Sequence, residues 1–207
     1  MRVTEGERTV KAASLRAGGA LNFPAFRSIL KEMSLSRLVF LVGLALMIVL
    51  PVRQWVVEPI YIATPSMDPT LPVGAHVFLD KVTTRLRGPQ RGDIIVFTPP
   101  PGAEAESGHE FVKRVIAVGG ETIALEEKKV VVNGKPLDDD HAFHSRAGEA
   151  LQGDNLGPLT VPDGMLFVLG DNRDESKDSS VWKDPKTGEP SPFLPVSNVK
   201  GLVRGFY

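Results

Sequence analysis

The chain contains no cysteine among its 207 residues. This absence excludes disulfide bonds, catalysis by a thiolate and zinc sites built on cysteine ligands. A basic surplus is missing as well, because residues 54–207 hold no more Lys and Arg than Asp and Glu. Without a basic surface that could neutralise phosphates, we expect no nucleic-acid partner.

Long hydrophobic runs are also lacking, with one exception at residues 38–52. This segment, LVFLVGLALMIVLPV, is uncharged and almost wholly apolar. It is short for a membrane span, which needs ~20 helical residues. Arg53 and Gln54 can reach the lipid headgroups and Trp55 can mark the interface, which lengthens the span. We therefore predict a transmembrane anchor over residues 38–57.

The same segment also fits the apolar region of a cleaved secretory signal peptide. Two features favour an uncleaved anchor: the polar region before it is long, and no small-x-small cleavage site follows in VRQWVVEPIYI. The preceding tail, residues 1–37, holds seven Lys and Arg against three acids. Such a basic tail is expected to stay in the cytoplasm, so that residues 58–207 lie on the outer side of the cell membrane.

Beyond the anchor, short apolar runs alternate with Gly, Pro and Asn, a pattern typical of an all-β domain. We predict a mainly β domain over residues 58–207, with Asn133-Gly134 forming a hairpin turn. Three stretches, 99–109, 138–160 and 183–195, are expected to be irregular, and the last is too rich in Pro and Lys to be core. The predicted strands cover residues 73–80, 92–98, 110–118, 121–125, 129–133, 165–169 and 199–206.

Two residues, Lys113 and Ser66, are candidates for catalysis. In the stretch EFVKRVIAVGG, a period of two puts Lys113 on one strand face with Phe111 and Val115. An ammonium group between apolar neighbours loses hydration, so its pKa falls and a neutral amine becomes available near pH 7. Ser66 lies in ATPSMDPTLP, where two prolines form a rigid turn that can present a hydroxyl. Together the two residues indicate a Ser/Lys hydrolase.

Four segments resemble, in chain order, the conserved boxes of type I signal peptidase, a membrane-anchored Ser/Lys protease. They are VEPIYIATPSMDPTL, RGDIIVF, FVKRVIAVGGE and VLGDNRDESKDS. Any one of them alone would be weak, but four in order make the match specific. The resemblance implies a mostly antiparallel β fold with a shallow apolar groove, and removal of signal peptides from exported preproteins.

Carried over residue by residue, the resemblance makes Ser66 the nucleophile and Lys113 the general base. A serine between prolines is by itself more often a turn residue, and a strand lysine more often an exposed one. The oxyanion hole would consist of the Ser66 backbone N–H and the hydroxyl of Thr64. Here TPSM replaces the commoner SGSM, so Pro65 stiffens the loop and removes one N–H.

Supporting roles follow from the same comparison. Ser176 matches a serine that orients the lysine, and Asp171 and Arg114 match a pair that holds the last box against the lysine strand. Asp178 matches a further supporting residue. Its usual arginine partner is replaced by Ser180 in this chain.

The family accepts small side chains, typically alanine, at the first and third positions before the cut. The resemblance implies that an extended signal peptide binds by strand addition. Shallow apolar pockets explain such a preference, and candidate groove residues are Ile60, Ile62, Met67 and Phe78. The expected partners are signal peptides of exported preproteins and the lipid bilayer.

No cofactor or metal is expected. His141 and His144 follow three aspartates, residues 138–140, but no helical period puts both rings on one face. A solvated acidic loop explains this cluster better than a metal site does.

Two other functions remain open. The same fold can serve as an inactive module that binds exported chains, which only the changes at Pro65 and Ser180 favour. A self-cleaving repressor uses similar chemistry on a related fold, but it requires a DNA-binding head and a cleavable linker. This chain has a hydrophobic segment in that place.

Overall fold

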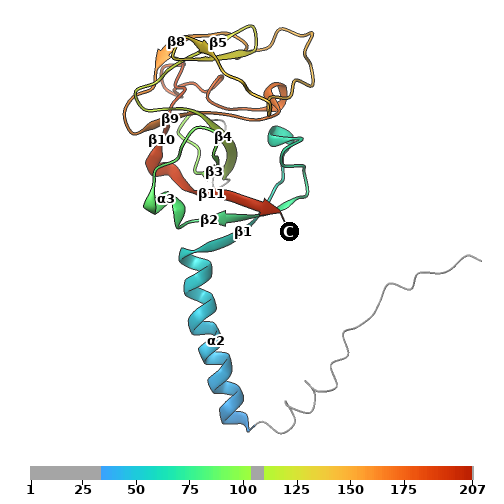
Figure 1. Ribbon diagram of the computed structural model, residues 1–207, viewed down its shortest axis with the longest axis vertical. Coiled ribbons are helices and arrows are strands. Elements are labelled where there is room, and N and C mark those ends of the chain that lie inside the picture. The colour runs from blue at the N-terminus through green and yellow to red at the C-terminus, as the bar shows by residue number, and fades with distance from the viewer. Residues whose placement is uncertain (1–33, 104–109, 207) are drawn as a thin grey trace, which may run out of the picture. The chain divides into compact units, whose positions relative to one another are not determined.

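The computed structural model describes residues 34–103 and 110–206 (Figure 1). The predictions for residues 1–33 of the basic tail, and for residues 104–109 of the first irregular stretch, lie outside the described part. Within the described part, a long apolar helix precedes two antiparallel sheets.

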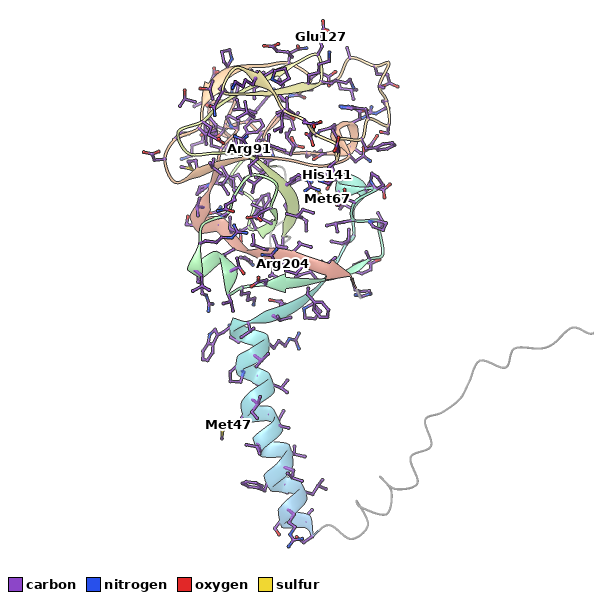
Figure 2. The ribbon with its side chains drawn as sticks, viewed as in Figure 1. Met47, Met67, Arg91, Glu127, His141 and Arg204 are labelled. Atoms are coloured by element: carbon purple, nitrogen blue, oxygen red, sulfur yellow. The ribbon has the colours of Figure 1, made fainter. Side chains whose placement is uncertain are left out.

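The helix, α2 (Leu35–Trp55), has 21 residues, and an 18-residue window within it has a mean hydropathy of 2.4. It is long and apolar enough to cross a membrane, and none of its side chains is buried (Figure 2). Its bounds differ from the predicted 38–57: it begins three residues earlier and does not include Val57. Val57 instead starts the first strand, as its β-branched side chain favours.

The larger sheet has seven strands in the order β1-β2-β11-β3-β4-β9-β10, and all neighbours are antiparallel. Their bounds are β1 Val57–Tyr61, β2 His76–Asp80, β3 Ile94–Phe97, β4 Phe111–Val118, β9 Met165–Leu169, β10 Leu194–Pro195 and β11 Val199–Phe206.

The smaller sheet has four antiparallel strands in the order β7-β6-β5-β8. They are β5 Thr122–Glu126, β6 Lys129–Val132, β7 Lys135–Pro136 and β8 Leu156–Thr160. Short helical turns connect the strands: η1 Pro65–Met67, α3 Thr83–Leu86, η2 Arg173–Glu175 and η3 Val196–Asn198. The predicted mainly β, antiparallel fold is thus confirmed.

Four strands were not predicted, and all four lie at sheet edges and contain a proline. They are β1 with Pro59, β7 with Pro136, β8 with Pro158 and β10 with Pro195. Proline cannot donate to a strand ladder, and an edge strand tolerates it because one side is unpaired. The edge position of these four strands therefore accommodates their prolines.

Two of the stretches expected to be irregular need correction. Residues 138–160 contain β8, and residues 183–195 contain β10. The second stretch was predicted to be too rich in Pro and Lys for the core, yet Leu194 is completely buried. Both of its lysines, Lys183 and Lys186, lie in its first four residues, so that the average composition hid an apolar end at Phe193 and Leu194.

Three hydrophobic clusters form the core, and β4 contributes to all of them. Val115 packs in the first cluster with Phe97 and Trp182, whereas Ile116 packs in the second with strands of the smaller sheet. Val112 packs against the third cluster. Both faces of β4 are therefore covered, and a polar side chain on either face of this strand is shielded from water.

The hairpin prediction is confirmed. Asn133 and Gly134 have φ of 52° and 72° and connect β6 to β7, as a type I′ turn requires. A second turn of the same length joins β5 to β6, with φ of 48° at Glu127 and 70° at Lys128. Sequence gave no signal for it, because neither residue is one that commonly adopts positive φ.

Candidate active site

Ser66 lies in η1, directly after Pro65 and five residues past the end of β1 at Tyr61. Proline occupies the first helical position, where its fixed φ suits a helix start and its missing N–H would have no partner within the helix. The turn is closed by the Asp68 N–H, which donates to the Pro65 carbonyl at 3.0 Å. Pro65 is therefore compatible with the loop that presents the serine.

Lys113 lies in the middle of β4, opposite Ile95 of β3. Its Nζ is 2.5 Å from Ser66 Oγ, although 47 positions separate the two residues in sequence. Lys113 is 4% exposed and Ser66 is 6% exposed. The structure thus brings an amine and a hydroxyl into hydrogen-bonding contact in a buried environment.

Burial lowers the pKa of Lys113 from 10.5 to about 8. The cause is desolvation, which disfavours the charged form. The negative charges of Asp178 and Asp171 act in the opposite direction and limit the shift. With a pKa about 8, roughly a tenth of the lysine is neutral at pH 7.

Thr64 precedes η1 by one residue and is exposed. Its Oγ1 lies 3.4 Å from Ser66 Oγ. The hydroxyl of an exposed residue therefore lies beside the buried Ser66 hydroxyl. The position agrees with a donor for a developing oxyanion.

The segment after β9 contacts both β4 and the turn that carries Ser66. Arg114 donates to both carboxylate oxygens of Asp171, at 2.7 and 2.6 Å, and both side chains are buried. Asn172 was not predicted as a site residue, yet it donates two hydrogen bonds to η1, the turn that carries Ser66. Its N–H donates to the Ser66 carbonyl at 3.1 Å, and its side chain donates to the Pro65 carbonyl at 3.3 Å.

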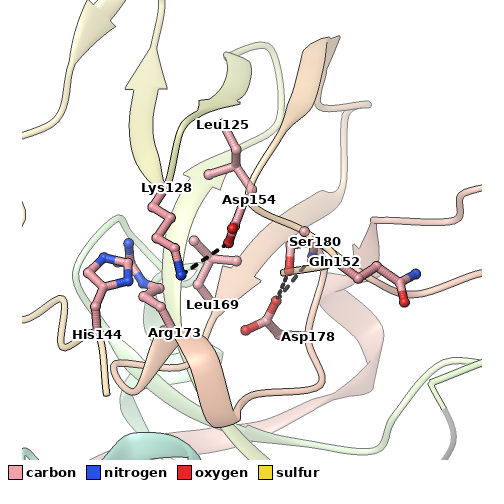
Figure 3. A pocket seen from close by; sticks show the side chains of 10 residues that line it. Leu125, Lys128, His144, Gln152, Asp154, Leu169, Arg173, Asp178 and Ser180 are labelled. Atoms are coloured by element: carbon pink, nitrogen blue, oxygen red, sulfur yellow. Dashed lines mark hydrogen bonds and ion pairs between the residues drawn. The ribbon is translucent and has the colours of Figure 1, made fainter. Parts of the chain in front are cut away.

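Asp178 is buried and accepts hydrogen bonds from uncharged groups (Figure 3). Oδ1 accepts from the Ser180 hydroxyl at 2.8 Å and its N–H at 3.1 Å. Oδ2 accepts from the Gly170 N–H at 2.9 Å and the Ser176 hydroxyl at 2.5 Å. Ser180, which replaces the family's usual arginine, thus supplies two of the donors that this carboxylate needs.

Ser176 was expected to orient the lysine. The hydroxyl proton of Ser176 is donated to Asp178, whose charge acts on Lys113. The structure therefore links Ser176 to the lysine through a carboxylate, and a direct role in orienting Nζ stays a prediction.

Gly170 belongs to the last box and lies against the turn that carries Ser66. A Cβ at this position would be 2.4 Å from the Ser66 carbonyl oxygen and 2.4 Å from Ser176 Oγ. We expect Gly170→Ala to displace one of these groups and to lower kcat/KM about 100-fold, since a shift of 1 Å at a reacting group has such an effect. Kinetics on a cleavable peptide would measure it. Gly157→Ala is the matched control, because no atom lies within 4 Å of a Cβ there; equal losses in both variants would contradict this account.

Three of the four candidate groove residues come together. Ile62 and Met67 are buried in the third cluster, and Ile60 packs against them. Phe78 does not join them. It alternates with Val77, which belongs to that cluster, so its side chain lies on the opposite face of β2.

A polar cluster beside the last box was not predicted. Lys128 donates to Asp174 at 2.8 Å. Its Nζ also lies 3.6 Å from a carboxylate oxygen of Asp154 (Figure 3). Burial acts to raise the pKa of Asp174, but hydrogen bonds from Lys128 and the Arg146 N–H outweigh it and lower that pKa. The cluster ties the β5–β6 turn to η2, two residues before Ser176.

His144 belongs to this cluster, with Nδ1 3.4 Å from Asp174 Oδ1. His141 lies in the loop before it. Among the residues that the structure describes, no group of His, Asp and Glu is arranged to hold a metal ion.

Several known proteins are similar in sequence to this chain. The family model described as signal peptidase, peptidase S26, matches residues 35–207. A probable signal peptidase I-2 from Synechocystis sp. is 38% identical over 139 residues, which cover 67% of this chain and 61% of that protein. A probable signal peptidase I-1 from the same organism is 38% identical over 164 residues, covering 78% and 76%.

A crystal structure of a signal peptidase I from Enterococcus faecalis V583 aligns with 30% identity and a TM-score of 0.41, over 57% of this chain and 98% of that one. The chain spans less than two thirds of the first Synechocystis relative. On the match of the family model to residues 35–207, the chain belongs to the signal peptidase family, peptidase S26.

Proposed function

We propose that the protein is a membrane-anchored serine endopeptidase that removes signal peptides from exported preproteins by means of a Ser66/Lys113 dyad. The observation that carries this proposal is the 2.5 Å contact between a buried Lys113 amine and the Ser66 hydroxyl. Family membership supports the reaction, and the lowered pKa of Lys113 supports the role of base.

In the first step, neutral Lys113 takes the proton of Ser66 while Oγ attacks the scissile carbonyl. The Ser66 N–H and the Thr64 hydroxyl stabilise the oxyanion. The C–N bond then breaks, and the Lys113 ammonium gives its proton to the leaving amine. An ester links the signal peptide to Ser66.

In the second step, Lys113 is neutral again and takes a proton from water, which attacks the ester. The C–O bond to Ser66 breaks, and the proton on Lys113 returns to Oγ. Ser66, Lys113 and Thr64 suffice for both steps, so the mechanism requires no cofactor.

Four residues have supporting roles in this proposal. The ion pair between Arg114 and Asp171 holds the last box against β4. Ser176 donates a hydrogen bond to Asp178 and so holds that carboxylate, whose charge acts on Lys113, in place. They act through other groups and are positioning residues. The two departures at Pro65 and Ser180 fit an active enzyme, since each meets the local requirement of its position. This argues against an inactive binding module.

The substrate in this proposal is an extended peptide. The edge strand β1 ends five residues before Ser66, and among the described residues no strand pairs with its outer side, which a substrate strand can therefore join. In this proposal Ile60, Ile62 and Met67, which pack together in the third cluster, line the pockets that accept only small side chains before the cut.

The anchor in this proposal is α2, which crosses the cell membrane once. Residues 1–37 lie in the cytoplasm, and residues 58–207 form the extracytoplasmic catalytic domain. The length and hydropathy of α2 and the basic charge before it support this topology.

Cleavage of a purified preprotein by the full chain in detergent tests the function. We expect a cut after alanine when alanine occupies the first and third positions before the site, and a rate at least 100-fold lower when phenylalanine replaces the first. Mass spectrometry of the products locates the cut, and the Ser66→Ala variant serves as the blank. Cleavage by that variant, or cuts after bulky residues, would overturn the proposal.

A further inference from the structure

A cavity of about 620 Å³ lies where α2 ends and the β domain begins. One part of its lining is apolar and comes from the last turns of the helix, Leu50, Pro51 and Trp55. The other part is charged and comes from Arg53, Glu58 and Lys81. The cavity therefore combines a surface for hydrocarbon with a surface for a charged group.

The charges of this cavity do not cancel. Lys81 forms an ion pair with Glu58, with Nζ 2.6 Å from Oε2. Arg53 is exposed and forms no ion pair with any residue in the described part of the chain. Arg85 of α3 adds a further cation nearby, since it donates to the Trp55 carbonyl at 3.4 Å. An anion is the ligand that this balance favours.

We propose that the cavity binds the headgroup of an anionic bilayer phospholipid. The phosphate accepts hydrogen bonds from Arg53 and Lys81, and the first acyl carbons lie along Leu50 and Trp55. A guanidinium matches the geometry of a phosphate, and tryptophan is favoured at the boundary between headgroups and hydrocarbon. This inference rests on the proposed function, because it requires α2 to be a membrane anchor.

A headgroup bound at this site would restrict the position of β1, the strand that precedes the turn with Ser66. Glu58 lies in β1, which leads to Ser66, and Lys81 directly follows β2, the neighbour of β1. A bound headgroup therefore fixes the start of β1 at the membrane surface. It holds the edge that receives the substrate at the level where a signal peptide leaves the bilayer.

The chain contains its own reporter for a test. Of its two tryptophans, Trp55 is 57% exposed and lines the cavity, whereas Trp182 is 3% exposed in the core. The full chain is reconstituted into phosphatidylcholine bilayers in which a minor fraction of the lipid is brominated. That fraction is either phosphatidylglycerol or phosphatidylcholine, and quenching of Trp55 reports which lipid is enriched beside it.

We expect brominated phosphatidylglycerol to be enriched about fivefold over brominated phosphatidylcholine, the effect of one uncompensated cation near a membrane. The variant Arg53→Gln/Lys81→Gln should quench equally with both lipids. The variant Lys129→Gln/Lys135→Gln removes the same charge from exposed positions of the smaller sheet and should keep the preference.

Equal quenching of the wild type by both lipids would overturn the inference while leaving the anchor intact. A preference that survives in the Arg53→Gln/Lys81→Gln variant would also overturn it. Absence of quenching by either lipid would contradict the membrane anchor itself, and with it the inference.

Discussion

Replacing Lys113 by methionine is expected to lower kcat/KM for a preprotein by about 10⁴-fold, the upper range for loss of a general base. Methionine has a similar length and fills the same space, but it cannot accept a proton. The loss should not come from unfolding. A buried ammonium is disfavoured by desolvation, so an apolar side chain at this position should leave the melting temperature equal or higher.

Two further variants separate catalysis from packing. Lys113→Arg keeps a cation but cannot be deprotonated, so it should be as inactive as Lys113→Met. Ser66→Ala combined with Lys113→Met should lose no more activity than either single variant, because the two residues act as a unit. Activity of Lys113→Met within tenfold of the wild type would show that another group serves as base.

Replacing Arg114 by methionine is expected to lower the free energy of unfolding by about 3–5 kcal/mol, the usual effect of breaking a buried ion pair. The change leaves the Asp171 carboxylate buried without its guanidinium, although both oxygens are now bound to it. Chemical unfolding of the full chain in detergent, followed by fluorescence of the buried Trp182, would measure the loss.

The double variant Arg114→Met/Asp171→Leu is the matched control. It removes both charges, and an apolar pair of similar volume often matches or exceeds a buried ion pair in stability. We expect it to regain most of the lost stability. A double variant as unstable as Arg114→Met would show that the cost comes from lost packing around the guanidinium and not from an unpaired charge.

Ser66 and Lys113 could be predicted as catalytic candidates because the sequence patterns that single them out lie within a few residues of each. Lys113 stands among apolar residues at strand spacing, and Ser66 stands between prolines, so each position was informative before any fold was known. The distance between them depends on how β4 pairs in the sheet, which no local pattern reveals. The resemblance to a family supplied that missing link.

Other features depended on contacts that sequence does not encode locally. The donors to Asp178 include a backbone N–H of Gly170, eight positions away and on another segment. Lys128 binds Asp174 across 46 positions from a turn without glycine. Phe78 was placed in the groove by its apolar character alone, whereas the alternation of β2 puts it on the other face. The four edge strands were missed because each is short and contains a proline, and their pairing partners lie elsewhere in the chain.

The pH dependence of kcat/KM tests most directly whether a neutral Lys113 is the base. Protonated Lys113 cannot accept the serine proton, so the rate should fall about tenfold for each pH unit below a pKa about 8. Above that pKa the rate should level off, and Asp178→Asn should move the limb to lower pH, because the Asp178 charge favours the ammonium. A rate that is constant from about pH 5 to 9, or a limb near the ordinary lysine pKa of about 10.4, would contradict the account.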